Sequence, residues 1–272
     1  MYWINGIQKK SISLNNRALH FGDGFFTTAR LKDGKVSLLD LHMKRLFLSA
    51  RRLMFHNLNL DLLYQEILQS ARCSKNGIIK VIISRLNQRS MSGYRSYNDS
   101  QVLRIICTYS FPKKYIQWYK RGVFLKISSV RLSRNSFFAG IKHLNRLEQV
   151  MIATDIYTNK IFDEALVLDV EDNIVECCSA NIFWRENNQV FTPSLYYSGV
   201  NGVMRQFILK LLFSIGYSVQ EITVGIERLS NIDEVFITNS LLPLASVNAI
   251  NNYFYPDKTL FNLLSAHIMK LI

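Results

Sequence analysis

The sequence predicts an α+β protein made of two mixed α/β domains. The chain has 272 residues, and 49% of them are hydrophobic, which is enough to build a sizeable core. Domains typically hold about 100–150 residues, so this length fits one large domain or two modest ones. Strand-like and helix-like segments alternate in both halves. Pro112, followed by Lys113 and Lys114, interrupts the pattern and places the expected boundary between residues 1–112 and 113–272.

The first elements are expected to be short strands. Tyr2–Ile7 contains an Asn-Gly pair between apolar residues, which is a strong hairpin signal. Phe25–Leu31 reads as a strand, and the turn at residues 32–35 leads into a second strand at Val36–Leu38.

Two helices and two strands are expected next. Asp40 is the expected N-cap of a helix whose apolar residues recur at helical spacing, and a second helix spans Leu60–Ser74. Gly77–Ser84 and Gln101–Tyr109 are apolar enough for partly buried strands. The polar stretch Arg85–Ser100 between them is long enough to be a functional loop.

The second half repeats this mixture of elements. Helices are expected at His143–Thr158, at Gly202–Ile215 and from Lys258 onward. A hairpin is expected between Ala165–Asp169 and Ile174–Ser179. Further strands are expected at Val123–Val130, Asn181–Arg185, Gln189–Thr192, Tyr217–Thr223, Glu234–Thr238 and Ala245–Ile250.

The chain is basic, with 33 Lys and Arg against 20 Asp and Glu and a net charge of +13. This charge suits either a polyanion such as nucleic acid or a diffuse field that attracts small anionic substrates. The basic residues are scattered and form no run of five or six like charges. A nucleic-acid-binding module is therefore kept only as an alternative, and we expect no nucleic-acid partner.

Several classes of protein are excluded. Four cysteines without a CxxC spacing argue against a disulfide scaffold and a structural zinc site. The N-terminus lacks the layout of a signal peptide, and no apolar run is long enough to cross a bilayer. We therefore expect a cytoplasmic protein with no membrane association.

Four local features could carry chemistry. The first is the turn Gly22-Asp23-Gly24, whose simplest interpretation is a tight turn alone. The second is Lys142, which lies where an apolar segment passes into an expected helix, close behind Gly140. A lysine held among apolar neighbours can lose its proton and act as a nucleophile or base, although most lysines are simply solvated.

The third feature is Glu176, a carboxylate on an otherwise apolar strand. It either faces solvent or is buried with a partner, because an unpaired buried charge is costly. The fourth is the stretch Ser198–Arg205, a turn with two glycines that opens a helix. Backbone N–H groups at a helix start can hold a phosphate, but ordinary helix-entry glycines are commoner.

Together these motifs resemble the branched-chain/D-amino-acid aminotransferase superfamily of pyridoxal-phosphate enzymes, and within it the aminodeoxychorismate lyases. The similarity runs through the whole chain in order. It rests on Arg17-Ala18, Phe21–Gly24, Phe26–Arg30, Gly34–Leu39, His42, Arg45-Leu46, Ala139–Val150, Asp163–Asp169, Glu176–Trp184 and Gly199–Phe207. The resemblance implies a class IV aminotransferase-like fold, with pyridoxal 5'-phosphate in a cleft between two domains, and a homodimer.

The resemblance also assigns cofactor residues. The lysine that binds the cofactor aldehyde covalently and then acts as the base falls on Lys142, and the carboxylate facing the pyridine nitrogen falls on Glu176. The arginine for the cofactor phosphate falls on Arg45. The phosphate-binding helix start falls on Asn201, Gly202 and Val203, and a second phosphate contact falls on Asn239 and Ser240. No metal is required.

In the lyase interpretation, the substrate is 4-amino-4-deoxychorismate and the products are 4-aminobenzoate and pyruvate. Thr28, Arg30 and Arg85 are the candidates for binding its carboxylates. Related lyases tend to have a glycine-rich loop after the Ser84-Arg85 position, whereas residues 86–95 contain a single glycine. This departure concerns the contacts of the loop with the substrate, and so the exact specificity. An aminotransferase acting on branched-chain or D-amino acids is the alternative, because the same lysine and carboxylate would serve it.

Overall fold

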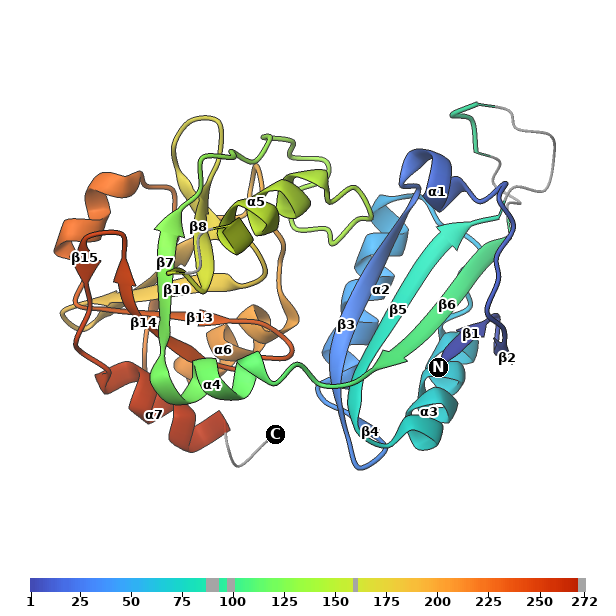
Figure 1. Ribbon diagram of the computed structural model, residues 1–272, viewed down its shortest axis with the longest axis horizontal. Helices are drawn as coiled ribbons and strands as arrows, with labels where there is room; N and C mark the ends of the chain where they lie inside the picture. Colours follow the sequence, from blue (N-terminus) through green and yellow to red (C-terminus); the bar gives the residue numbers. More distant parts are fainter. Residues whose placement is uncertain (87–92, 97–100, 159–160, 269–272) are drawn as a thin grey trace. The chain divides into compact units, whose positions relative to one another are not determined.

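The computed structural model describes residues 1–86, 93–96, 101–158 and 161–268 (Figure 1). It divides into two compact units, Met1–Phe111 with Ile141–Asn145, and Pro112–Gly140 with Arg146–Ile272. Both units combine helices with a sheet, so the α+β class is confirmed. The expected domain division at residue 112 remains a proposal; residues 141–145, which it gave to the second domain, group with the first unit.

The first unit is a sheet with two long helices on one face. Its described strands form one sheet in the order β2-β1-β6-β5-β3-β4. Its elements are β1 (Tyr2–Ile4), β2 (Ile7–Gln8), α1 (Arg17–Phe21), β3 (Gly24–Lys32), β4 (Lys35–Val36), α2 (Leu39–Arg52), α3 (Leu60–Ser74), β5 (Gly77–Arg85) and β6 (Val102–Tyr109).

Alternation along β3 decides which side chains meet the helices. Phe25 and Ala29 are buried and pack with Leu46 of α2 and Ile67 of α3 in the core of this unit. Successive side chains in a strand point to opposite faces, so Phe26, Thr28 and Arg30 lie on the other face of the sheet. The predicted hairpin at the N-terminus is confirmed, with Asn5 and Gly6 at positive φ as its turn requires.

Two local predictions were wrong. Asp40 lies in the first turn of α2, and the N-cap is Leu38, because the chain enters the helix through a left-handed residue at φ 52°. The helix expected from His143 begins at Leu147, as α5 (Leu147–Thr158). Residues 142–144 are not helical, because their backbone groups bond to the edge of β3.

The second unit holds a larger sheet. Its main strand order is β12-β11-β10-β13-β14-β7-β8-β9, and β15 pairs with β14. Besides α5, its elements are α4 (Lys114–Arg121), β7 (Val123–Ile127), β8 (Glu164–Leu168), β9 (Ile174–Cys177), β10 (Asn181–Glu186), β11 (Gln189–Pro193), α6 (Val203–Ser214), β12 (Val219–Ile222), the 3-10 helix η1 (Ile226–Asn231), β13 (Glu234–Thr238), β14 (Ala245–Ile250), β15 (Tyr253–Phe254) and α7 (Thr259–Ile268).

The strands β8 and β9 form the predicted antiparallel hairpin, and every residue of both strands is buried. A buried strand that carries a carboxylate must supply a partner for it. Among the described residues, the helices are all too short or too polar to span a bilayer.

Candidate active site

In the first unit, Lys142 lies against the edge of β3. The Phe26 N–H donates to the Lys142 carbonyl at 2.9 Å, and the Leu144 N–H donates to the Gly24 carbonyl at 2.9 Å. These bonds continue the sheet beyond the point where β4 ends, so the lysine has a fixed backbone. Its Nζ lies 4.8 Å from the centre of the Phe26 ring, where the π-face attracts a cation.

Arg45 approaches β3 from the helix side. It is buried on α2, and its guanidinium donates to the Thr27 hydroxyl. Thr27 Oγ1 also lies 2.6 Å from Nδ1 of His42, one helical turn before Arg45. Burial, and then the charge of Arg45, hold the pKa of His42 well below its ordinary value of 6.5. His42 is therefore a neutral partner that helps to orient the arginine without adding charge.

In the second unit, Glu176 is buried on β9 and only 5% exposed, which excludes the solvent-facing interpretation. Its Oε2 accepts the Val200 N–H at 2.8 Å. Glu176 also lies close enough to Arg146 to raise the pKa of that guanidinium, against the larger lowering caused by burial. A neighbouring cation and a donated N–H both favour the carboxylate anion.

The start of α6 lies beside this carboxylate. Gly202 is the N-cap of α6 and supplies no side-chain cap, so the first backbone N–H groups of the helix are available for another acceptor. A Cβ on Gly202 would lie 2.1 Å from Oδ1 of Asn181. Asn181 in turn donates to the Val200 carbonyl at 2.9 Å. The turn before α6 therefore requires a glycine at this position.

The loop after β13 carries Asn239 and Ser240. The Asn239 amide donates to the Ser179 carbonyl at 3.1 Å, and its Oδ1 accepts the Leu241 and Leu242 N–H groups at 2.8 Å. The Asn239 side chain thus closes the turn itself. A contact from this loop to an anion would have to come from backbone groups or from the Ser240 hydroxyl.

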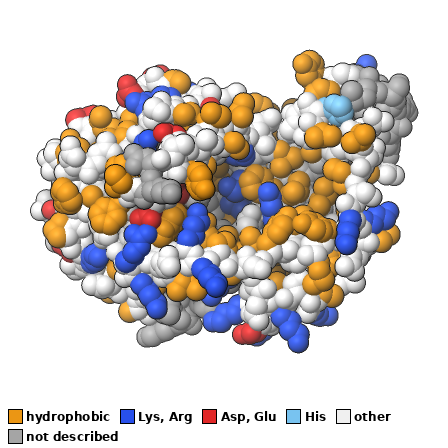
Figure 2. All heavy atoms as spheres, viewed as in Figure 1, with side chains coloured by type: hydrophobic (Ala, Val, Ile, Leu, Met, Phe, Trp, Pro, Cys, Tyr) orange, Lys and Arg blue, Asp and Glu red, His pale blue; other side chains and the backbone are white. Residues whose placement is uncertain are grey.

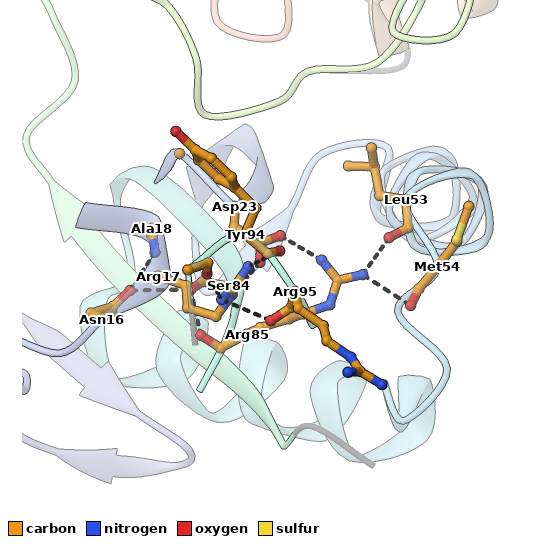
Figure 3. Close-up of polar contacts among 12 residues, drawn as sticks. Asn16, Arg17, Ala18, Asp23, Leu53, Met54, Ser84, Arg85, Tyr94 and Arg95 are labelled. Carbon is orange, nitrogen blue, oxygen red and sulfur yellow. Dashed lines mark hydrogen bonds and ion pairs between the residues drawn. The ribbon is translucent and has the colours of Figure 1, made fainter. Parts of the chain in front are cut away.

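The three expected substrate residues have different surroundings in the first unit. Thr28 and Arg30 are half-buried on the sheet face opposite the helices, and the Arg30 guanidinium stacks 4.7 Å from the Phe111 ring centre. Arg85 is buried at the end of β5. Its guanidinium pairs with Asp23 and donates to the Leu53 and Met54 carbonyls at 2.5 and 3.0 Å (Figure 3).

Residue-level reasoning from sequence missed the contacts of three residues at these sites, Asp23, Thr27 and Arg146. Asp23 was expected only in a turn, yet its carboxylate bridges Arg85 and Arg17. Thr27 links His42 to Arg45, and Arg146 lies near Glu176. The signal for Asp23 was a carboxylate between two glycines with an arginine six residues before it; the other contacts had no local signal.

On the face shown in Figure 2, Lys and Arg side chains lie scattered among apolar and uncharged ones. With a net charge of +13, this distribution fits a diffuse field for small anions better than a nucleic-acid footprint.

Comparisons with known proteins agree with these motifs. Residues 24–250 match the family described as amino-transferase class IV. The aminodeoxychorismate lyase of Vibrio harveyi is 35% identical over 254 residues, covering 92% of each chain. A D-alanine aminotransferase of Bacillus licheniformis is 26% identical, covering 89% of this chain and 83% of its own.

Among solved structures, the 4-amino-4-deoxychorismate lyase of Pseudomonas aeruginosa superposes with a TM-score of 0.94 at 31% identity. The match covers 99% of this chain and 98% of that one. The family match extends over more than half of the sequence, and similarity to the lyases runs through nearly all of it. This chain belongs to the class IV amino-transferase family.

Proposed function

We propose that this protein is a pyridoxal-phosphate-dependent lyase that converts 4-amino-4-deoxychorismate into 4-aminobenzoate and pyruvate. The observation that carries this function is the similarity to two lyases over nearly the whole chain, at 35% and 31% identity. The D-alanine aminotransferase is more distant, at 26% identity. The chemistry of both units is compatible with this choice.

The side chains fit pyridoxal 5'-phosphate in each unit taken by itself. In the first, Lys142 offers the amine for the aldehyde and Arg45 offers a cation for the phosphate. In the second, the glycine-dependent start of α6 offers N–H donors for the phosphate, and the buried Glu176 offers an anion for the pyridinium. Ser240 would add a second phosphate contact.

The bound cofactor supplies an electron sink for the charge left when a proton departs from the carbon bearing the substrate amine. Lys142 would first hold the cofactor covalently and then take this proton on Nζ. Phe26, which bonds the lysine backbone and lies beside its Nζ, limits the positions that the amine can reach. Glu176, held by the Val200 N–H, would keep the pyridine nitrogen protonated.

The proposed reaction balances without another reactant. The proton at C4 goes to Lys142, the bond from the ring to the enolpyruvyl oxygen breaks, and the leaving group takes a proton and becomes pyruvate. The ring becomes aromatic, which drives the reaction forward. Transamination would instead return a proton to the cofactor and would require a keto-acid partner.

Recognition of the two substrate carboxylates is assigned to cations and hydroxyls near Lys142. Thr28 and Arg30 share the sheet face of Phe26, and this places them on the side of the sheet where the Lys142 amine lies. Arg85, also a substrate candidate, would act mainly through the contacts it makes with Asp23 and α2, because its guanidinium is engaged there. A basic protein also attracts a dianion at long range.

The proposed reaction also suggests a pathway, a cellular compartment and an oligomeric state for the protein. The product 4-aminobenzoate places the enzyme in folate synthesis, which we assign to the cytoplasm. We further propose that it works as a homodimer on a small-molecule substrate, without nucleic acid or membrane.

A reconstituted assay tests the function. Purified protein with pyridoxal phosphate is incubated with chorismate, glutamine and an aminating synthase, and 4-aminobenzoate and pyruvate are measured. Equal amounts of both products are expected. Borohydride reduction followed by peptide mass spectrometry should place the cofactor on Lys142. Amino-group exchange between an amino acid and 2-oxoglutarate, without 4-aminobenzoate, would favour the aminotransferase.

A further inference from the structure

In the second unit, a buried carboxylate that the proposed chemistry does not use lies behind the loop that follows β13. Glu164, the first residue of β8, is only 3% exposed. Its Oε2 accepts the Ser179 hydroxyl at 2.5 Å, and its Oε1 accepts the Ala165 N–H at 3.0 Å. A buried charge is costly unless its hydrogen-bonding capacity is used, so these donors matter for the fold around Glu164.

The pKa of Glu164 depends on a balance between burial and these donors. Burial raises the pKa of the carboxyl, whereas hydrogen bonds from Ser179 and Ala165 and the charge of Lys114 lower it. Loss of the Ser179 hydroxyl would take a donor away from a buried oxygen, which costs more than the loss of an exposed hydrogen bond. Glu164 and Ser179 should therefore act as a unit.

Ser179 connects this carboxylate to the loop after β13. Asn181, the first residue of β10, pairs with Thr238, the last residue of β13, so the turn before β10 and the loop after β13 lie at the same end of this strand pair. The Asn239 amide donates to the Ser179 carbonyl at 3.1 Å. The Tyr115 hydroxyl of α4 bonds with the Ser179 and Asn239 side chains. The position of Ser179 therefore determines the position of Asn239.

Asn239 in turn determines the shape of the loop that carries Ser240. Its Oδ1 accepts the Leu241 and Leu242 N–H groups at 2.8 Å, and its own N–H donates to the Leu242 carbonyl at 2.8 Å. These bonds close a tight turn with Ser240 as its second residue. Ser240 is half-buried, and within the part of the chain that the structure describes its hydroxyl donates to no protein group. This hydroxyl is available for an external acceptor.

We propose that Glu164, acting through Ser179 and Asn239, is a positioning residue that holds Ser240 where it can bind the phosphate of pyridoxal phosphate. The inference rests on the proposed function for the identity of the cofactor. It has a specific consequence, because a defect at Glu164 should weaken binding of the phosphate group and leave the reaction of the aldehyde with Lys142 intact.

The test compares Glu164→Gln with Glu234→Gln. For each apoprotein, fluorescence titration gives the dissociation constants of pyridoxal phosphate and of pyridoxal, which lacks the phosphate. Glutamine has a single acceptor oxygen, so it can serve only one of the two donors that Glu164 serves. Glu234 is the matched control: it is also a fully buried strand carboxylate that accepts backbone N–H groups, but it lies at the opposite end of β13 from Asn239.

Glu164→Gln is expected to weaken binding of pyridoxal phosphate about tenfold, equivalent to about 1.4 kcal/mol, and binding of pyridoxal less than about twofold. Glu234→Gln should lower the free energy of unfolding but leave both dissociation constants within about twofold of the wild type, because its carboxylate does not contact the loop that carries Ser240.

A double-mutant cycle tests the route through Ser179. Ser179→Ala removes the hydroxyl and should match the effect of Glu164→Gln, and the double variant should bind pyridoxal phosphate no more weakly than either single variant. Ser179→Thr keeps a hydroxyl and should recover most of the affinity. Since Ser179 is exposed, Ser179→Ala and Ser179→Thr carry the test should Glu164→Gln fold poorly.

An unchanged affinity for pyridoxal phosphate in folded Glu164→Gln would overturn the inference. Equal losses for pyridoxal, or equal losses in Glu234→Gln, would also overturn it, since they would indicate a general loss of structure. Additive effects in the double variant would exclude the route through Ser179. A wild type that binds pyridoxal phosphate but forms no 4-aminobenzoate would refute the proposed function alone, and the dissociation constants would still decide the inference.

Discussion

The backbone of Gly22 lies against the side chain of Asn145: a Cβ at position 22 would come within 2.2 Å of the asparagine Oδ1. Gly22 also has φ +61°, the left-handed region that glycine enters without a steric cost. The turn before β3 and the segment carrying Lys142 therefore fit together only when residue 22 has no side chain. This close approach is the physical basis for a glycine-flanked turn near the start of the chain.

Gly22→Ala should destabilise the protein and slow covalent binding of pyridoxal phosphate, because Asn145 must move and the Lys142 backbone follows. Gly216→Ala is the control, since Gly216 also has positive φ, at +85°, but no atom within 4 Å of its missing Cβ among the described residues. Both variants carry backbone strain of about 1 kcal/mol, and overpacking adds about 1–3 kcal/mol at Gly22 alone. Urea unfolding and the rate of cofactor absorbance change measure the two effects. Equal changes in unfolding free energy and in cofactor-binding rate for the two variants would show that the Asn145 side chain can move aside at little cost.

Glu176→Gln should lower kcat by about 10- to 100-fold. This loss corresponds to one charge-assisted hydrogen bond, which contributes about 1.5–3 kcal/mol. Glutamine keeps the shape and can still accept the Val200 N–H, so covalent attachment at Lys142 should persist. Visible absorbance and borohydride trapping check the attachment, and product formation checks the rate.

Glu148→Gln is the matched control for this carboxylate. Glu148 also acts on the Arg146 charge, yet its carboxylate accepts the Ser133 N–H and hydroxyl on the surface of α5. Its replacement should leave kcat within about twofold, a change near the error of mutational comparisons. A comparable loss of rate in both variants would point to Arg146, and not to the pyridine nitrogen, as the target of the Glu176 charge.

Gly202→Ala should weaken cofactor binding about tenfold, equivalent to about 1.4 kcal/mol. Its backbone is not in the left-handed region, so the expected defect comes from the contact of the new Cβ with Asn181 at the start of α6. Adding Asn181→Ala removes the obstructing oxygen and should recover part of the affinity. Fluorescence titration of the apoprotein with pyridoxal phosphate gives the dissociation constants. No recovery in the double variant would mean that the lost Asn181–Val200 bond outweighs the steric effect.

The sequence was most informative where local chemistry decides structure. The Asn-Gly hairpin, the β8–β9 hairpin and the long helices were all predicted. Their signals are turn residues and the spacing of apolar residues, which depend only on residues close together in the sequence. Lys142 and Glu176 were identified through resemblance, since a lysine and a strand carboxylate alone each had an ordinary alternative interpretation.

The remaining errors have a common physical cause. His143 and Leu144 were predicted to be helical, but the edge of β3 offers this segment hydrogen bonds that no local pattern encodes. Arg85 was expected to bind substrate and Arg17 was given no role, and only tertiary packing brings both to Asp23. Long-range pairing of this kind overrides local propensity and lies beyond the reach of a single sequence.

Stability should fall as the pH drops below about 6.5, because His42 is neutral when folded and its pKa is lowered there by burial and by Arg45. A group with a depressed folded-state pKa binds its proton more readily in the unfolded chain, so its contribution is complete above 6.5 and is lost as the pH falls toward the folded-state value. A single proton limits the slope to about 1.4 kcal/mol per pH unit. His42→Gln can still bond Thr27 but cannot titrate, so its urea midpoint should change less between pH 7.5 and 5.5 than that of the wild type. Parallel curves for the two proteins would remove His42 as the source of the acid sensitivity.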